Sequence, residues 1–217
     1  MNQLALLRLL QLSDSQFPIG SFAHSSGLET YAQMGLDKEG LAELLAGQLE
    51  LGFGRLELAA CALAFDLKTN EDLDELGAEL SAWKPVKGLR ETSLKLGKRL
   101  LTLSSRIYPT ETSGLVLEQP HHTIVFGTLG RRLDIKLEPL LLAFTQSSIT
   151  SSLAAATRCM SLSPEQSQEI LTSLQPQMLD AVNRVTSDPH ANFFSAAPAL
   201  DVRAQQQAFL YSRLFQS

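Results

Sequence analysis

The sequence predicts an all-α protein, a single compact helical domain of roughly eight to ten helices with flexible N- and C-terminal segments. Three observations predict this class. Apolar residues recur at steps of three and four over long stretches, which places them on one face of a helix. Strand signals are sparse, and no hairpin dipeptide separates alternating apolar runs. The 217 residues, of which 44% are hydrophobic, are enough for one good-sized core over residues 1–217.

Two helices are predicted between residues 41 and 83. A leucine series from Leu41 to Leu63 indicates one helix face, although the glycines at positions 47, 52 and 54 each weaken the helix by roughly 1 kcal/mol relative to alanine. Asn70 is the expected N-cap of the next helix, because the two acidic residues after it suit a helix N-terminus. That helix should continue to Trp83, just before Pro85.

The clearest helical signals follow. The apolar period is strongest over residues 86–107, whose outward positions are mostly lysine and arginine. A long helix is predicted over residues 138–160, and its second half, rich in serine, threonine and alanine, suits a crowded central helix. Ser163 should begin another helix, because Pro164 fits the first helical position and Gln166 completes a capping box.

Charge and apolar content exclude several classes of protein. The formal net charge of −5 argues against nonspecific nucleic-acid binding, which needs clustered lysine and arginine. No apolar stretch approaches the roughly 18 residues of a membrane helix. The apolar start contains Arg8 and follows no basic region, so a signal peptide is not expected. Cys61 and Cys159 have no partner at metal-ligand spacing, so we expect a cytoplasmic protein with both thiols on apolar helix faces.

Catalytic and metal-binding patterns are weak. The chain has no G-x-S-x-G elbow, no phosphate-binding loop and no H-E-x-x-H, so no catalytic residue, cofactor or metal site is predicted. His24 and Ser25 are neighbours in sequence, and such neighbours seldom meet the geometry of an activated serine. His121 and His122 are expected in a solvent-facing loop. The residues after them, 123–127, fit a short strand or a turn of a buried helix.

The C-terminal segment 199–217 is expected to contain an amphipathic helix followed by a docking tail. Its last residues include Tyr211, Arg213, Leu214 and Phe215, where a chain normally frays. Aromatic side chains and arginine are typical interface anchors, so the tail is predicted to become ordered on a partner protein. Docking of the tail on the chain's own core is the alternative.

Four motifs, in chain order, resemble the UreF family of urease accessory proteins. LLQLSDSQFPIGSFAHSSGLE (9–29) resembles the family's leucine-rich helix followed by Pro-[IV]-Gly-[GS]-[FY]-x-[HY]-S-x-G-[LIM]-E. RETSLKLGKRLL (90–101) and HHTIVFG (121–127) are similar to two internal motifs of the family. The last residues, 211–217, look like the family's closing tail. One departure is that Ser161–Gln166 replaces the family's Pro-Leu-Gly-Gln turn.

The resemblance implies an all-α protein without catalytic activity or a cofactor. It implies a cytoplasmic homodimer that binds the accessory protein UreD (also called UreH) and recruits the GTPase UreG. That complex acts on apo-urease (UreABC), and GTP hydrolysis by UreG is coupled to nickel insertion.

The expected partner-binding residues lie mainly in an N-terminal partner-binding segment (1–24) and in the C-terminal docking tail (199–217). They are Phe17, Pro18, Gly20, Phe22, His24, Ser25, Glu29, Arg158, Tyr211, Arg213, Leu214 and Phe215. The turn at Pro18 and Gly20 is expected to make the opening segment a recognition element.

Two other functions remain open from the sequence. A helical scaffold or adaptor for another complex would share the same features, and only the motif series argues against it. A small all-α metalloenzyme would need Glu-x-x-His pairs on facing helices, whereas Glu118 and His121 form a single such pair.

Overall fold

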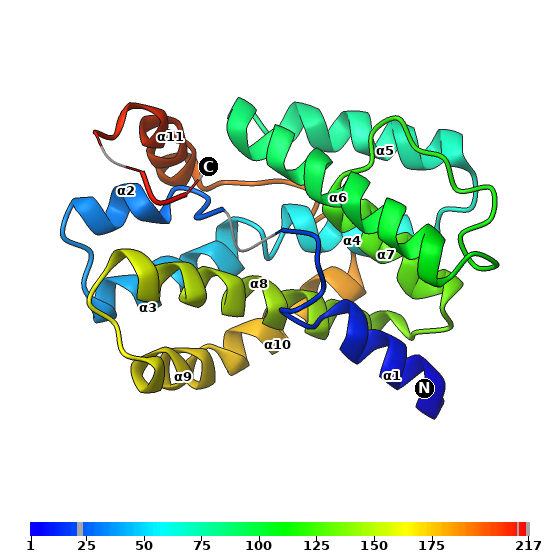
Figure 1. The fold of residues 1–217 in the computed structure, drawn as a ribbon, viewed down its shortest axis with the longest axis horizontal. Helices are drawn as coiled ribbons and strands as arrows, with labels where there is room; N and C mark the ends of the chain where they lie inside the picture. The colour runs from blue at the N-terminus through cyan, green and yellow to red at the C-terminus, as the bar shows by residue number, and fades with distance from the viewer. Residues whose placement is uncertain (21–23, 212, 216–217) are drawn as a thin grey trace.

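Eleven α-helices and a short 3-10 turn make up the computed structural model, which describes residues 1–20, 24–211 and 213–215 (Figure 1). No strand occurs in these ranges, so the predicted all-α class is confirmed. The helices are α1 (Gln3–Leu12), α2 (Leu28–Gln33), α3 (Lys38–Leu51), α4 (Leu56–Asp66), α5 (Asn70–Trp83), α6 (Lys87–Ile107), α7 (His122–Arg132), α8 (Leu137–Cys159), α9 (Pro164–Ser173), α10 (Gln175–Ser187) and α11 (Pro198–Gln206), and the 3-10 turn is Gln207–Phe209.

Helices α4 and α7 pack against each other along the middle of the core. The sequence of α4, LELAACALAFD, is apolar nearly all round, and most of its residues are buried. In α7, every residue from Thr123 to Gly130 is buried. The two helices approach closely at Gly127, where a Cβ would overlap the carbonyl oxygen of Cys61. The segment 123–127 is therefore part of a buried helix and not a strand.

Two groups of helices cover this pair. Helix α6 packs on α7, and a small apolar cluster joins α5 to α4 and α7. Helices α3, α8, α9 and α10 form the other group, in which α8 contacts α2, α4, α7, α9 and α10 (Figure 1). Helix α1 packs three apolar side chains on the main core, and they are Ala5, Leu9 and Leu12.

The helix predicted over residues 41–63 is two helices, α3 and α4. Helix α3 ends at Leu51, and the chain turns between Gly52 and Arg55. A Cβ at Gly54 would overlap the carbonyl oxygen of Leu49, so the turn at this position requires glycine. The break therefore falls where glycine weakens the helix and permits a close backbone approach.

Two predicted helix starts have different outcomes. Thr69, not Asn70, caps α5, since the amide of Asp72 donates to Thr69 Oγ1 at 3.1 Å. The capping box of α9 is confirmed: the Gln166 amide donates to Ser163 Oγ at 3.2 Å, and the Ser163 amide donates to Gln166 Oε1 at 2.9 Å. The sequence that replaces the family's turn is thus a well-formed helix start.

The amphipathic helix expected from residue 199 does not form an apolar face. Helix α11 has no buried residue, and the side chains of Val202 and Phe209 are exposed. Among the described residues of the C-terminal segment 199–217, the buried side chains are those of Gln207 and Phe215. Few buried contacts therefore hold this segment to the rest of the chain.

We expect Gly127→Ala to lower the free energy of unfolding by about 1–3 kcal/mol, because the added methyl group would force α7 away from α4. Gly47→Ala is the matched control: it lies within α3 with nothing near its Cβ position, so alanine should stabilise the helix by about 0.5–1 kcal/mol. Urea unfolding followed by far-UV circular dichroism measures both. Equal effects of the two substitutions would contradict the close crossing of α4 and α7.

Candidate functional site

The loop between α1 and α2, residues 13–27, is called the opening loop below. Phe17 and Ile19 are buried, whereas Pro18 between them is exposed. Gly20 has a φ of 88°, which glycine adopts without steric cost, and its Cβ position is 3.3 Å from Nη1 of Arg99 on α6. The opening loop is thus anchored by alternate apolar side chains and passes close to α6. The predicted site residue Phe22 lies outside the described residues.

The end of the opening loop contacts the C-terminal segment. The side-chain oxygen of Gln207, a buried residue, accepts hydrogen bonds from Ser25 Oγ and from the Gly27 amide, both at 3.1 Å. The amide nitrogen of the same Gln207 side chain donates to Glu29 Oε2 at 3.2 Å. One glutamine therefore joins the first turn of α2 to the 3-10 turn near the C-terminus.

Glu29 has an exposed fraction of 2% and accepts three hydrogen bonds from the C-terminal segment. The backbone amide of Leu214 donates to Oε1 at 2.6 Å, and the amide of Phe215 donates to Oε2 at 3.3 Å. The third donor is the Gln207 side chain. Among the described residues, no lysine or arginine forms a salt bridge with Glu29, so amide donors satisfy its carboxylate.

Phe215 is the apolar anchor of the tail. Its side chain is buried, and the guanidinium carbon of Arg158, at the end of α8, lies 4.6 Å from the centre of its ring. This distance is within the range of a cation–π interaction. Four predicted partner-binding residues, Ser25, Glu29, Arg158 and Phe215, therefore meet around the tail. The tail contacts the chain's own core, which is the alternative that the sequence left open.

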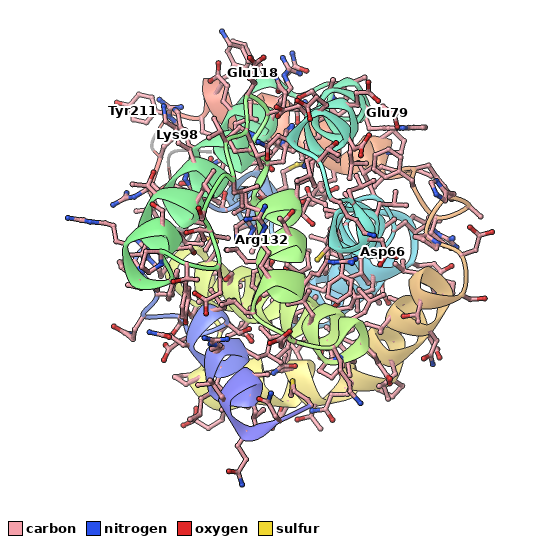
Figure 2. All side chains as sticks on the ribbon, turned by 90° about the vertical axis from the view of Figure 1, so that its right-hand side faces the viewer. Asp66, Glu79, Lys98, Glu118, Arg132 and Tyr211 are labelled. Atoms are coloured by element: carbon pink, nitrogen blue, oxygen red, sulfur yellow. The ribbon has the colours of Figure 1, made fainter. Side chains whose placement is uncertain are left out.

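Other tail side chains point outward. Tyr211 is fully exposed, and Figure 2 shows its side chain projecting from the helical body. Arg213 and Leu214 are exposed as well, although the backbone of Leu214 is bonded to Glu29. The inner side of the tail is thus occupied by the protein itself, and the outer side is open.

His24 and Ser25 do not form a nucleophile–base pair. Ser25 Oγ donates to Gln207, whereas His24 Nδ1 lies 3.5 Å from Thr92 Oγ1 on α6. Burial and the positive charge of Lys95 lower the pKa of His24. The two side chains therefore connect the opening loop to different elements, Ser25 to the 3-10 turn and His24 to α6.

A buried polar cluster, which we call the histidine cluster, was missed by the sequence analysis. Lys84 forms a salt bridge with Glu57 at the start of α4. His121 is fully buried; its Nε2 lies 2.8 Å from Ser81 Oγ and its Nδ1 lies 3.0 Å from Ser93 Oγ. The cluster joins α4, α5, α6 and the start of α7. One feature of the sequence could have indicated this cluster: Ser93, in the motif RETSLKLGKRLL, places a hydroxyl group on the apolar face of the predicted helix.

The expected solvent-facing loop at His121 and His122 is wrong. A Cβ at Gly97 of α6 would overlap the carbonyl oxygen of Pro120, so this glycine admits the chain into the core just before α7. The ring of His122 then lies 5.8 Å, centre to centre, from that of Phe144 on α8. The close approach of two backbones thus buries His121 and places His122 in a partly buried position against α8.

A cavity of about 710 Å³ lies between the opening loop and helices α3, α6 and α8. Small side chains of α8, such as Ser147, Ser151 and Ala154, line one part of it. Glu57 and Lys84 of the histidine cluster also border it, as does His122. On this side the small residues of α8 leave open space, whereas Ala155 and Ala156 in the same half of the helix are buried in the core, as the sequence suggested.

The described residues contain no group of three or more histidine, cysteine, aspartate or glutamate side chains that could hold a metal ion. Glu118 is exposed and points away from the core, whereas His121 is buried, so this Glu-x-x-His pair does not converge (Figure 2).

Burial raises the pKa of the Cys61 and Cys159 thiols, which suits packing and not nucleophilic chemistry. Within the described ranges, none of the helices is long and apolar enough to cross a membrane.

Comparison with known proteins gives consistent matches. A family model described as UreF matches residues 36–175. The urease accessory protein UreF of Actinobacillus pleuropneumoniae is 34% identical, with 96% of this chain and 97% of that protein covered. The corresponding protein of Haemophilus influenzae strain PittEE is 33% identical, with 96% of this chain and 94% of that protein covered. The corresponding protein of Geobacillus kaustophilus is 30% identical, with 98% of both chains covered.

These matches define the class of the protein as an accessory protein, a class that is not catalytic. The chain belongs to the UreF family of urease accessory proteins. The alignments with these relatives cover 96% to 98% of the chain, so they extend beyond residues 36–175 on both sides.

We expect the free energy of unfolding to fall as the pH is lowered from 7 to 5. Burial lowers the pKa of His121 and of His122 to about 4, whereas unfolded histidine titrates near pH 6.5. The unfolded state therefore binds more protons between these values, and stability is lost as the pH falls, by about 2 kcal/mol for each imidazole at pH 5. Urea unfolding at pH 7, 6 and 5 measures this.

His190→Gln, at an exposed histidine, is the control and should show the same pH dependence. A free energy of unfolding that is equal at pH 7 and pH 5 would rule out neutral, buried histidines.

Proposed function

We propose that this protein is a urease maturation chaperone that binds UreD/UreH and recruits the GTPase UreG. In this proposal it acts as a cytoplasmic homodimer within the complex, and it couples GTP hydrolysis by UreG to nickel insertion into apo-urease (UreABC). Membership of the UreF family supports the maturation role. The sequence contains no phosphate-binding loop, and the proposal leaves the nucleotide chemistry to the partner.

The observation that carries the proposal is the open outer side of the C-terminal tail. Phe209 is 85% exposed and Leu214 is 61% exposed, and Tyr211 between them is fully exposed. Aromatic side chains and arginine are enriched where proteins bind one another, and Arg213 lies in the same stretch. A partner protein such as UreD would cover these side chains.

Helix α1 offers a second apolar surface. Leu4, Leu7 and Leu10 are each more than half exposed, on the side opposite to the residues that α1 buries. Successive exposed leucines at a spacing of three form a continuous stripe. We assign this stripe and the opening loop to the N-terminal partner-binding segment, where exposed apolar surface is typical of an interaction site.

We expect a truncated chain that lacks residues 210–217 to lose co-purification with UreD. Truncation removes the outer aromatic side chain of Tyr211 and the anchor Phe215, but it leaves Gln207 bonded to Ser25. The far-UV helical signal should be nearly unchanged, because the described residues of this stretch, 210–211 and 213–215, are not helical. Co-expression of the tagged chain with UreD and UreG, followed by light scattering on the purified complex, gives the readout.

Leu179→Ser is the matched control, since Leu179 on α10 is also an exposed apolar residue but belongs to neither proposed segment. It should leave the complex intact. Full recovery of UreD with the truncated chain would reject the tail as a binding element. A full-length chain that ignores both UreD and UreG would favour the alternative function, a helical adaptor for another complex.

A further inference from the structure

We propose that the outer face of α6 is a docking surface for an acidic patch on the partner protein, and that it extends the surface formed by α1 and the opening loop. The inference rests on the proposed function in its choice of partner, UreD. It adds a helix that neither terminal segment includes, and it specifies that the contact is electrostatic.

Basic residues gather on one side of α6. Five of them are exposed, and we call them the basic face: Lys87, Lys95, Lys98, Arg99 and Arg106. At 100° per residue they fall within about one third of the helix circumference, opposite the side that α6 packs on α7. Figure 2 shows Lys98 at the surface of the molecule.

The basic face stands out because the chain as a whole is acidic. Helix α6 contains six of the 18 lysines and arginines of the protein, but only one of its 23 acidic residues, Glu91. Glu91 lies 3.7 Å from Lys87. Among the described residues, no carboxylate forms a salt bridge with the other four cations of the basic face. A face exposed only for solubility mixes both signs, so this single sign indicates an acidic ligand.

The charges of the basic face do not stabilise the helix that carries them. The first turn of α6 contains no acidic residue, and Lys87 is its first residue, although a helix N-terminus favours negative charge. Lys95 and Arg99 are four residues apart, a spacing at which like charges destabilise a helix. A partner of opposite charge would relieve both effects.

The basic face lies next to the elements already assigned to the partner. Tyr108 follows α6 directly, and the centre of its ring lies 5.7 Å from the guanidinium carbon of Arg8 on α1. In the middle of α6, Nη1 of Arg99 is 3.3 Å from the Cβ position of Gly20 in the opening loop. The exposed leucines of α1 and the basic face thus combine an apolar area with a charged edge, which is the usual make-up of an interface.

An acidic protein surface fits these observations better than other polyanions. The net charge of −5 disfavours nucleic acid, and α6 has no aromatic side chain on which a base could stack. An anionic membrane would favour several basic residues on the apolar helix itself, whereas α1 has only Arg8, which forms a salt bridge with Glu111. The partner should therefore present carboxylates along about 30 Å, the length of α6 at about 1.5 Å per residue.

Charge reversal within the basic face tests the inference. Lys95→Glu combined with Lys98→Glu should lower the rate of association with immobilised UreD about tenfold at low salt, because opposite charges steer the encounter of two proteins. The rates of the variant and the unaltered chain should converge as NaCl is raised from about 50 mM to about 500 mM, since salt screens exposed charges. Equal rates at low salt would overturn the inference and leave UreD binding itself intact.

Lys98→Glu and Lys68→Glu form a matched pair of single substitutions. Both lysines are exposed, but Lys68 lies between α4 and α5. Lys98→Glu should lower the association rate about threefold at low salt, whereas Lys68→Glu should leave it unchanged. Equal losses would show that only the net charge of the chain matters, which would overturn the inference.

A milder variant covers the case in which the reversed charges prevent folding. Lys95→Gln combined with Lys98→Gln removes two exposed charges and adds none of opposite sign. It should lower the association rate about threefold at low salt. An unchanged rate in this variant would overturn the inference as well.

Other occupants of the basic face would give different results. If Lys95→Glu with Lys98→Glu dissociates a homodimer in light scattering, the face binds a second copy of the chain, and the inference is overturned. Binding of the unaltered chain, but not of this variant, to vesicles containing phosphatidylserine would assign the face to a membrane and would also overturn it.

Failure of the proposed function is distinguishable from failure of the inference. If the unaltered chain does not bind UreD, the proposed function fails, and poly-L-glutamate then tests the basic face alone. Binding at low salt that is lost with Lys95→Glu and Lys98→Glu, but kept with Lys68→Glu, would support an acidic ligand for this face. Absence of binding, or binding that all variants keep, would overturn it.

Discussion

The close approach of α7 to its neighbours is the constraint on which the rest of the structure depends. Gly127 allows α7 to touch the backbone of α4, and Gly97 allows α6 to touch the backbone just before α7. With these contacts made, α7 is buried almost along its whole length, and α5, α6 and α8 can only pack around the α4–α7 pair. The two glycines, which have no side chain, thus determine where several long helices lie.

Much of the fold could be predicted because its signals are local. The capping box at Ser163 and the apolar period from Val86 to Ile107 depend on residues within a few positions of one another, and both predictions agree with the structure within one residue. The break at Gly52–Gly54 and the burial of His121 could not be predicted in this way. Each depends on which distant backbone lies against a glycine or an imidazole, and no local spacing contains that information.

The site shows the same division. Resemblance to the family selected Ser25, Glu29, Arg158 and Phe215 one by one, but it did not indicate that they meet. These residues are adjacent because α2, α8 and the tail, which are far apart in the sequence, pack against one another in the fold. The histidine cluster was missed because Lys84 and Glu57 each resemble an ordinary solvated charge when considered in sequence alone.

The contact between Glu29 and Phe215 also has a consequence for biosynthesis. The two residues are 186 positions apart, so the ribosome completes α2 long before it makes the amides that satisfy the Glu29 carboxylate. Closing so long a loop is slow relative to forming the intervening helices, which rely on nearby contacts. An interrupted translation product would therefore contain most of the helical core and yet lack this closure. The tail can therefore attach to Glu29 only in a chain that has been translated through residue 215.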